Sequence, residues 1–186
     1  VAPRKNGLHT VSDSFLVKES NAVTVSNETI GKVAILLCTY QGERYLAEQI
    51  DSIISQTYDN WVIYASDDGS QDHTLEILRA YQKKLGTERF FVLPGPQQGY
   101  VNNFFSLVKN QSIVADYYAF CDQDDIWSED KLYVSIQWLK KHAVETPSLY
   151  CGRTALVNEL GVKVGNSPLF KYPPSFKNAL VQSLAG

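Results

Sequence analysis

Three aspartates within four residues are the strongest chemical signal in this sequence. Asp122, Asp124 and Asp125 follow directly after the apolar run 117–121, and Trp127 closes the motif. Carboxylates this close repel one another, and burial beside a strand end increases the repulsion. Because no Lys or Arg lies beside them, a divalent cation with oxygen ligands is the group that would relieve it. The motif therefore predicts a metal site on Asp122 and Asp124, where the ion would hold a diphosphate.

The same residues also fit a purely structural role. Acidic turns before helices are common, and Asp125 or Ser128 could cap a helix that follows. The position of the motif directly after a strand, beside Trp127, favours the metal site.

A second pair of carboxylates, Asp67 and Asp68, follows the apolar run 61–65. One of them could accept a hydrogen bond from the ring N–H of uracil or thymine, because a pyrimidine imide needs an acceptor at that position. We prefer Asp68 to Asp67 for this role. The structural alternative is an acidic turn in which Gly69 supplies the bend.

Two further sets of polar residues follow the apolar run 33–38 and Gly99. After 33–38, the ring of Tyr40 could stack on a base while Thr39 fixes the edge of that base, or Thr39 could simply cap the next helix. After Gly99, the side chains of Asn102 and Asn103 could reach phosphate or sugar, although capping the short helix that follows is the simpler interpretation.

Strands and helices alternate along the chain and would position these groups. The hydrophobic patterns predict helices at 45–56, 72–84, 101–109 and 128–142, and strands at 33–38, 61–65, 90–93, 117–121, 149–151 and 154–157. This alternation predicts an α/β fold with a mostly parallel sheet flanked by helices. Ligands bind such sheets at the carboxyl ends of the strands. Three of the polar sets fall there: Thr39 with Tyr40, Asp67 with Asp68, and the motif 122–125.

The composition narrows the class of protein. With 186 residues, 44% of them hydrophobic, the chain suits one globular domain, and a net charge of −3 without a basic run argues against nucleic acid as a partner. The three widely spaced cysteines predict neither a zinc knuckle nor a disulfide framework and fit a reducing, cytoplasmic compartment. The sequence also lacks a phosphate-binding P-loop, a Gly-x-Gly-x-x-Gly after the first strand and a Gly-x-Ser-x-Gly elbow, which argues against kinases, dinucleotide oxidoreductases and ordinary α/β-hydrolases.

Taken in order, four motifs resemble family 2 glycosyltransferases of the GT-A fold, a Rossmann-like architecture. The motifs are 33–43, 55–58, 66–74 and 122–127, and the resemblance covers about 32–139. The last motif is especially similar to rhamnosyltransferase-like members that build bacterial cell-surface polysaccharides.

The resemblance implies inverting, metal-dependent transfer from a UDP- or dTDP-sugar to a saccharide or lipid-linked saccharide acceptor. It implies Mg²⁺ or Mn²⁺, with Asp124 as the main ligand and Asp122 in support. A lipid-linked acceptor would also imply peripheral association with the inner face of the cell membrane. Together with the residues above, the expected nucleotide-binding set is Cys38, Thr39, Tyr40, Glu43, Asp67 and Asp68.

Two features depart from the family pattern. Family members use a carboxylate base after the metal motif, and residues 156–186 contain no matching acidic motif, so we assign no catalytic base. The chain also ends about where the acceptor-side segment of the family usually begins. Residues 32–186 are therefore expected to form an incomplete, C-terminally truncated donor-binding domain, preceded by a poorly defined segment at 1–31. Two alternatives stay open: a nucleotide- and metal-binding module without turnover, and a nucleotidyltransferase, although its Gly-rich loop is not matched here.

Overall fold

The computed structural model describes residues 9–13, 31–142, 148–158 and 162–168. Most of the segment 1–31 and everything after Pro168 lie outside these residues. Much of the stretch 156–186, in which we found no acidic motif for a base, therefore also lies outside them. The chain divides into two compact units, one formed mainly by Leu16–Ile54 and Tyr58–Asp124 and the other mainly by Val1–Phe15 and Asp125–Gly186. We describe each unit by itself.

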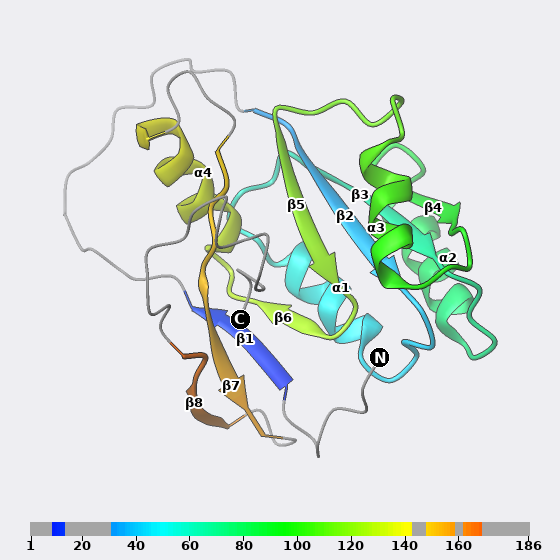
Figure 1. Ribbon diagram of the computed structural model, residues 1–186, viewed down its shortest axis with the longest axis horizontal. Helices are drawn as coiled ribbons and strands as arrows, with labels where there is room; N and C mark the ends of the chain where they lie inside the picture. The colour runs from blue at the N-terminus through cyan, green and yellow to red at the C-terminus, as the bar shows by residue number, and fades with distance from the viewer. Residues whose placement is uncertain (1–8, 14–30, 143–147, 159–161, 169–186) are drawn as a thin grey trace. The chain divides into compact units, whose positions relative to one another are not determined.

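The larger unit contains a four-stranded sheet in the order β4-β3-β2-β5 (Figure 1). All of its neighbouring strands are parallel, which confirms the predicted sheet. Every residue of β2 and β3 is buried, as expected for continuous apolar runs at the centre of a parallel sheet. The strands are β2 (Val33–Thr39), β3 (Trp61–Asp67), β4 (Phe90–Pro94) and β5 (Tyr117–Asp122).

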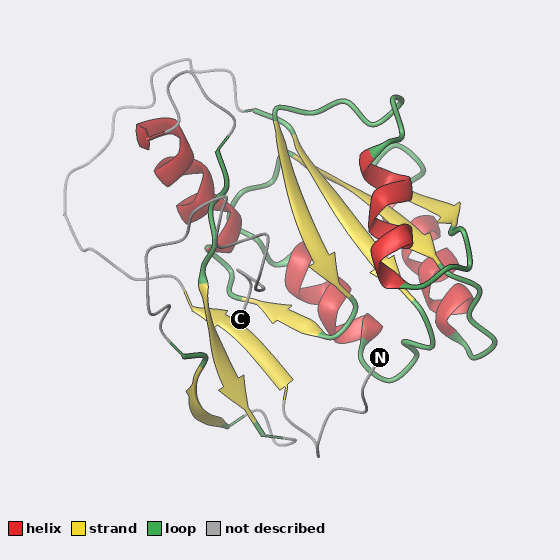
Figure 2. Ribbon diagram, in the orientation of Figure 1, coloured by secondary structure: helices red, strands yellow, loops and turns green. Residues whose placement is uncertain are grey.

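Helices α1 (Leu46–Ile54), α2 (Thr74–Leu85) and α3 (Tyr100–Val108) belong to the same unit (Figure 2). Each lies within two residues of a predicted helix. On one face of the sheet, alternate residues of β2 and β3 form an apolar cluster with Leu107 of α3 and Ile113. Burying these side chains orders the strands and so fixes where the strand ends lie.

The other unit contains a second four-stranded sheet in the order β6-β1-β7-β8. Strand β1 pairs in parallel with β6 and antiparallel with β7, and β7 pairs antiparallel with β8. The strands are β1 (His9–Asp13), β6 (Asp125–Trp127), β7 (Arg153–Val157) and β8 (Lys163–Asn166). The strand predicted at 149–151 is wrong: pairing between β1 and β7 ends at Asp13 and Arg153, so β1 offers those residues no partner.

Helix α4 (Lys131–His142) completes this unit, and its start corrects two predictions. Asp125 lies in β6 rather than capping the helix, because its backbone pairs with Thr10 of β1. The hydroxyl of Ser128 is buried and has no hydrogen-bond partner within the described part of the chain. Gln56 performs the capping role instead: its Oε1 accepts the Leu132 N–H at 3.0 Å, and its Nε2 donates to the Ser128 carbonyl at 2.7 Å.

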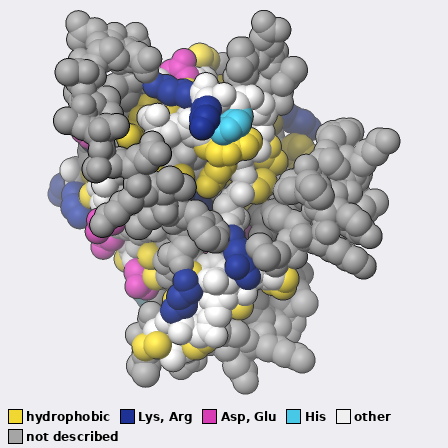
Figure 3. Space-filling model, turned by 90° about the vertical axis from the view of Figure 1, so that its left-hand side faces the viewer, with side chains coloured by type: hydrophobic (Ala, Val, Ile, Leu, Met, Phe, Trp, Pro, Cys, Tyr) yellow, Lys and Arg dark blue, Asp and Glu magenta, His cyan; other side chains and the backbone are white. Residues whose placement is uncertain are grey.

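The end of α4 carries aromatic and basic side chains. The Trp138 ring stacks on His142 at 4.5 Å between centroids and lies 5.6 Å from the ring of Tyr150. Figure 3 shows apolar, basic and histidine side chains gathered on one face of the molecule. Within the described residues, no helix has the length and apolar character needed to cross a membrane.

Candidate functional site

The register of the parallel sheet brings the predicted site residues to one edge. Cys38 near the end of β2 pairs with Ser66 on one side and with Asp122 on the other. The next residue, Thr39, pairs with Asp67. The candidate groups that follow β2, β3 and β5 therefore begin at the same level of the sheet.

Asp67 uses its carboxylate to build the turn after β3. Its Oδ2 accepts hydrogen bonds from Thr39 Oγ1 at 2.8 Å and Ser70 Oγ at 2.6 Å. Its Oδ1 accepts the backbone N–H groups of Gly69 at 3.2 Å and Ser70 at 2.9 Å. A carboxylate has about four lone-pair positions, so these bonds occupy its capacity. Thr39 therefore anchors this turn and does not cap a helix.

Asp68 is equally buried but differently engaged. Its two oxygens accept the backbone N–H groups of Gln97 at 2.6 Å and Gly99 at 2.7 Å, in the loop after β4. Gly99 has a φ of 88°, a left-handed conformation that glycine adopts without strain. Among the described residues, these bonds leave about two of the roughly four lone-pair positions of Asp68 available. Asp68 thus retains acceptor capacity that Asp67 lacks.

Asn103 binds the end of strand β3, a role that was not predicted from the sequence. It is buried, its Nδ2 donates to the Ser66 carbonyl at 2.8 Å, and its Oδ1 accepts the Ser66 hydroxyl at 2.6 Å. The predicted capping role is wrong, because the N-cap of α3 is Gly99, which makes no side-chain capping bond. Asn102 is exposed and donates to the Gln98 carbonyl at 3.1 Å. An Asn just inside a helix is a weak signal for such a clamp, since only the fold brings Ser66 beside it.

Tyr40 presents a largely exposed ring, with 56% of the residue accessible. Its backbone N–H donates to Gln123 Oε1 at 2.8 Å, and its carbonyl accepts from Gln123 Nε2 at 2.9 Å. The backbone is held while the ring remains available to stack on a ligand.

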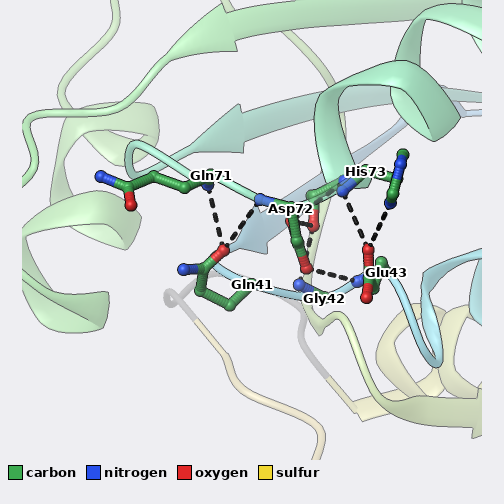
Figure 4. A network of polar contacts seen from close by, with 7 residues as sticks. Gln41, Gly42, Glu43, Gln71, Asp72 and His73 are labelled. Atoms are coloured by element: carbon green, nitrogen blue, oxygen red, sulfur yellow. Dashed lines mark hydrogen bonds and ion pairs between the residues drawn. The ribbon is translucent and has the colours of Figure 1, made fainter.

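Glu43 belongs to a network that ties the loop after β2 to the start of α2 (Figure 4). Its Oε2 accepts the His73 backbone N–H at 3.0 Å and lies 2.7 Å from His73 Nδ1. Its own backbone N–H donates to Asp72 Oδ2 at 3.1 Å, and Gln41 Oε1 accepts the backbone N–H groups of Gln71 and Asp72. The hydrogen bond from the His73 backbone lowers the pKa of Glu43, and the bond to Glu43 raises the pKa of His73.

Cys38 is a neutral thiol that lies near the carboxylates of Asp122 and Asp68. It is buried, and burial raises the pKa of this thiol, with the charges of Asp122 and Asp68 adding to the effect. A thiol that stays protonated acts as a small wall residue rather than as a nucleophile.

Asp122 is exposed at the end of β5, and Asp124 follows two residues later, half-buried. In the described ranges, no group of three His, Cys, Asp or Glu side chains is arranged to hold a metal ion. Mg²⁺ commonly binds one or two protein carboxylates together with waters and substrate phosphates, and Mn²⁺ takes similar oxygen ligands. The two aspartates fit an ion of that kind, delivered with a diphosphate.

The comparisons with known proteins decide the family. Residues 34–159 match the model of the family "Glycosyl transferase family 2". The chain belongs to this family. The match contains every candidate site residue named above, from Cys38 to Asp124.

The chain is similar to several glycosyltransferases, two of which we describe here. It is 38% identical over 106 residues to "dTDP-rhamnosyl transferase RfbG" of Shigella flexneri, covering 55% of this chain and 36% of that protein. It is 33% identical over 114 residues to "Putative glycosyltransferase EpsE" of Bacillus subtilis, covering 60% of this chain and 39% of that protein. The matched region thus covers well under half the length of these relatives.

Solved structures confirm the GT-A-like fold. A mannosyltransferase from Pyrobaculum calidifontis, PcManGT, solved with GDP-Man and Mn²⁺, matches with a TM-score of 0.56 at 18% identity, over 68% of this chain and 37% of that one. S. aureus TarS 1-349 matches with a TM-score of 0.51 at 21% identity, over 64% of this chain and 38% of that one.

Proposed function

We propose that the protein contributes the donor-binding part of an inverting glycosyltransferase that uses a UDP- or dTDP-sugar. The single observation that carries the proposal is the strand register, which sets Asp122 on one side of Cys38 and the Asp67–Asp68 turn on the other. This arrangement suits a ligand that has a base at one end and a diphosphate at the other.

The base would lie between Tyr40 and Asp68. The exposed Tyr40 ring offers a stacking surface, and Asp68 retains lone pairs to accept the imide N–H of uracil or thymine. Neither adenine nor cytosine carries an imide N–H on its ring, so this acceptor favours UDP and dTDP over ADP and CDP donors. Asp67, Thr39 and Cys38 would support the pocket, and Glu43 would hold its loop.

Asp124 and Asp122 would hold Mg²⁺ or Mn²⁺ beside the diphosphate. Such an ion neutralises the charge that develops on the departing nucleoside diphosphate. The presence of Mn²⁺ with GDP-Man in PcManGT supports a divalent ion for this chain.

In the proposed reaction, the acceptor hydroxyl oxygen bonds to the anomeric carbon while the bond from that carbon to the diphosphate oxygen breaks. The bonding electron pair leaves with the nucleoside diphosphate, and the hydroxyl proton passes to a carboxylate base. We assign that base to no residue of this chain. The similarity to the dTDP-rhamnosyl transferase RfbG supports dTDP-rhamnose as a donor. As the acceptor we propose a saccharide or lipid-linked saccharide that becomes part of a cell-surface polysaccharide.

Thermal unfolding with UDP, dTDP, GDP and ADP, each with and without Mn²⁺, tests the proposal. A ligand that binds only the folded state raises the unfolding midpoint by mass action. We expect a rise with UDP or dTDP that depends on Mn²⁺ and is lost in Asp124→Ala. Equal shifts with ADP, or no shift with any nucleotide, would contradict the proposed donor class. Release of UDP or dTDP from a matching donor in a turnover assay would separate a transferase from a module that only binds.

A further inference from the structure

The side chain of Gln123 lies inside the acidic motif but interacts with the loop after β2. Its Oε1 accepts the Tyr40 N–H at 2.8 Å, and its Nε2 donates to the Tyr40 carbonyl at 2.9 Å. A primary amide can make this pair of bonds with one residue's backbone only when the two groups are closely aligned. The contact therefore fixes both polar backbone groups of Tyr40 at once.

This pairing continues the sheet beyond its last backbone pair. Strands β2 and β5 pair up to Cys38 and Asp122. Tyr40 lies one residue beyond the end of β2, and there the Gln123 amide takes the place of a backbone partner. The following residue, Gln41, has a φ of 51°, so the chain turns immediately afterwards. Tyr40 is therefore the last residue that the edge of the sheet holds in place.

Gly42 provides a second, independent sign that the position of Gln123 matters. A Cβ atom at Gly42 would lie 2.7 Å from Gln123 Cδ and would also clash with Gln123 Oε1, so the Gln123 side chain would have to shift. Any larger residue at 42 would thus displace the Gln123 amide from Tyr40. Glycine at this position leaves room for the pairing.

We propose that Gln123 is a positioning residue for the nucleoside, although it lies between the two residues assigned to the metal. Its amide fixes the position of Tyr40 relative to Asp122 and Asp124. The base pocket is thereby held at a constant distance from the diphosphate site. The inference depends on the proposed function and deepens it. Its distinctive consequence is that losing Gln123 weakens nucleoside binding even when neither phosphate nor metal is present.

The test is an NMR titration of wild type and variants with uridine and thymidine in EDTA. We expect Gln123→Ala to weaken affinity about five- to tenfold, the equivalent of one or two ordinary hydrogen bonds. Gly42→Ala should produce a similar loss from the other side of the contact. Asp124→Ala should leave nucleoside affinity within about twofold and lose only the Mn²⁺-dependent gain with UDP or dTDP. Gln111→Ala, an exposed glutamine in the turn after α3, is the matched control.

A double-mutant cycle on the free energy of unfolding tests the contact without any ligand. Gly42→Ala should lower the free energy of unfolding beside Gln123, because the displaced amide gives up its two bonds to Tyr40, and should cost less in the Gln123→Ala background, where those bonds are already absent. Additive effects would overturn the contact and the inference.

The outcomes separate the two proposals. If wild type binds a nucleoside and Gln123→Ala binds it equally well, the inference fails while the proposed function stands. A loss in Gln123→Ala that appears only with UDP or dTDP and Mn²⁺ would assign Gln123 to the metal and diphosphate instead. If wild type binds no nucleoside and no UDP or dTDP with Mn²⁺, the proposed function fails and the inference fails with it.

Discussion

At the residue scale, two adjacent aspartates have different environments. Asp67 accepts bonds at both oxygens from its own turn and from Thr39, whereas Asp68 accepts only two backbone N–H groups from the loop after β4. We preferred Asp68 for the base from the sequence, but local sequence does not reveal these bonds, because their partners come from β2, the turn after β3 and the loop after β4. The role of Asp68 toward a ligand remains a prediction.

The two aspartates should therefore respond differently to substitution. Asp67→Ala leaves buried donors unpaired and should lower the free energy of unfolding by about 2–3 kcal/mol, measured by urea denaturation. Asp68→Asn keeps one acceptor oxygen but replaces the other with a donor, and we expect it to reduce UDP or dTDP affinity more than tenfold with a smaller loss of stability. Equal losses of stability and affinity in both variants would contradict this division of roles.

At the element scale, the sequence predicted the regular elements that bury apolar runs. Strands β2 and β3 and helices α1 to α3 have local hydrophobic patterns, which determine their positions to within about two residues. Strand β6 and the cap of α4 depend on β1 and Gln56, which are distant in the sequence. Local pattern carries no information about such partners, and for the same reason the clamp by Asn103 was missed.

The start of α4 offers a direct test of its unexpected cap. Gln56→Ala removes the acceptor of the Leu132 N–H and should lower the free energy of unfolding by about 1–3 kcal/mol. Ser128→Ala removes a buried hydroxyl that has no partner among the described residues, so stability should stay unchanged or rise by up to about 1 kcal/mol. Chemical denaturation measures both, and a larger loss in Ser128→Ala would restore the serine cap.

The link between the loop after β2 and helix α2 should depend on pH. The pKa of His73 is raised above its ordinary value of 6.5, so its stabilising effect is full below about pH 6.5 and is lost as pH rises through the raised value. The pKa of Glu43 is lowered from 4.5, so its effect is present above that pH and is lost as pH falls through the lowered value. The contact between Glu43 and His73 should therefore be strongest at pH values between the lowered pKa of Glu43 and the raised pKa of His73.

Melting temperatures of wild type and Glu43→Gln, compared across pH 5.5 to 8.5, measure this dependence. We expect the wild type to be the more stable at low pH and the difference to shrink as His73 loses its proton. Both side chains are exposed to solvent, so the effect should be small and should weaken further in salt. A difference that grows with pH would contradict the ion pair.

At the scale of the whole molecule, a parallel sheet gathers the candidate groups although they are up to 86 residues apart, from Cys38 to Asp124. We propose that the ion binds Asp122 and Asp124 together with the nucleotide, because Mg²⁺ commonly takes one or two protein carboxylates along with substrate phosphates. EDTA should therefore leave the melting temperature of the ligand-free protein unchanged and should abolish the extra stabilisation by UDP or dTDP with Mn²⁺. A clear fall in the ligand-free melting temperature would instead indicate a structural metal.

Strand β2 is buried along its whole length and is flanked on both sides by parallel strands. Amide hydrogens in such a strand exchange with solvent only through the rarest openings of the molecule, whereas loop amides exchange through frequent local ones. Hydrogen exchange should therefore be slowest at the centre of β2. The amides of 41–43 donate to the side chains of Ser70, Thr74 and Asp72 and not to a neighbouring strand, so they should exchange faster than those of β2. The nucleoside would then be bound where the slowest-exchanging strand meets this loop, and ligand binding should protect the amides of 41–43 more than those of β2.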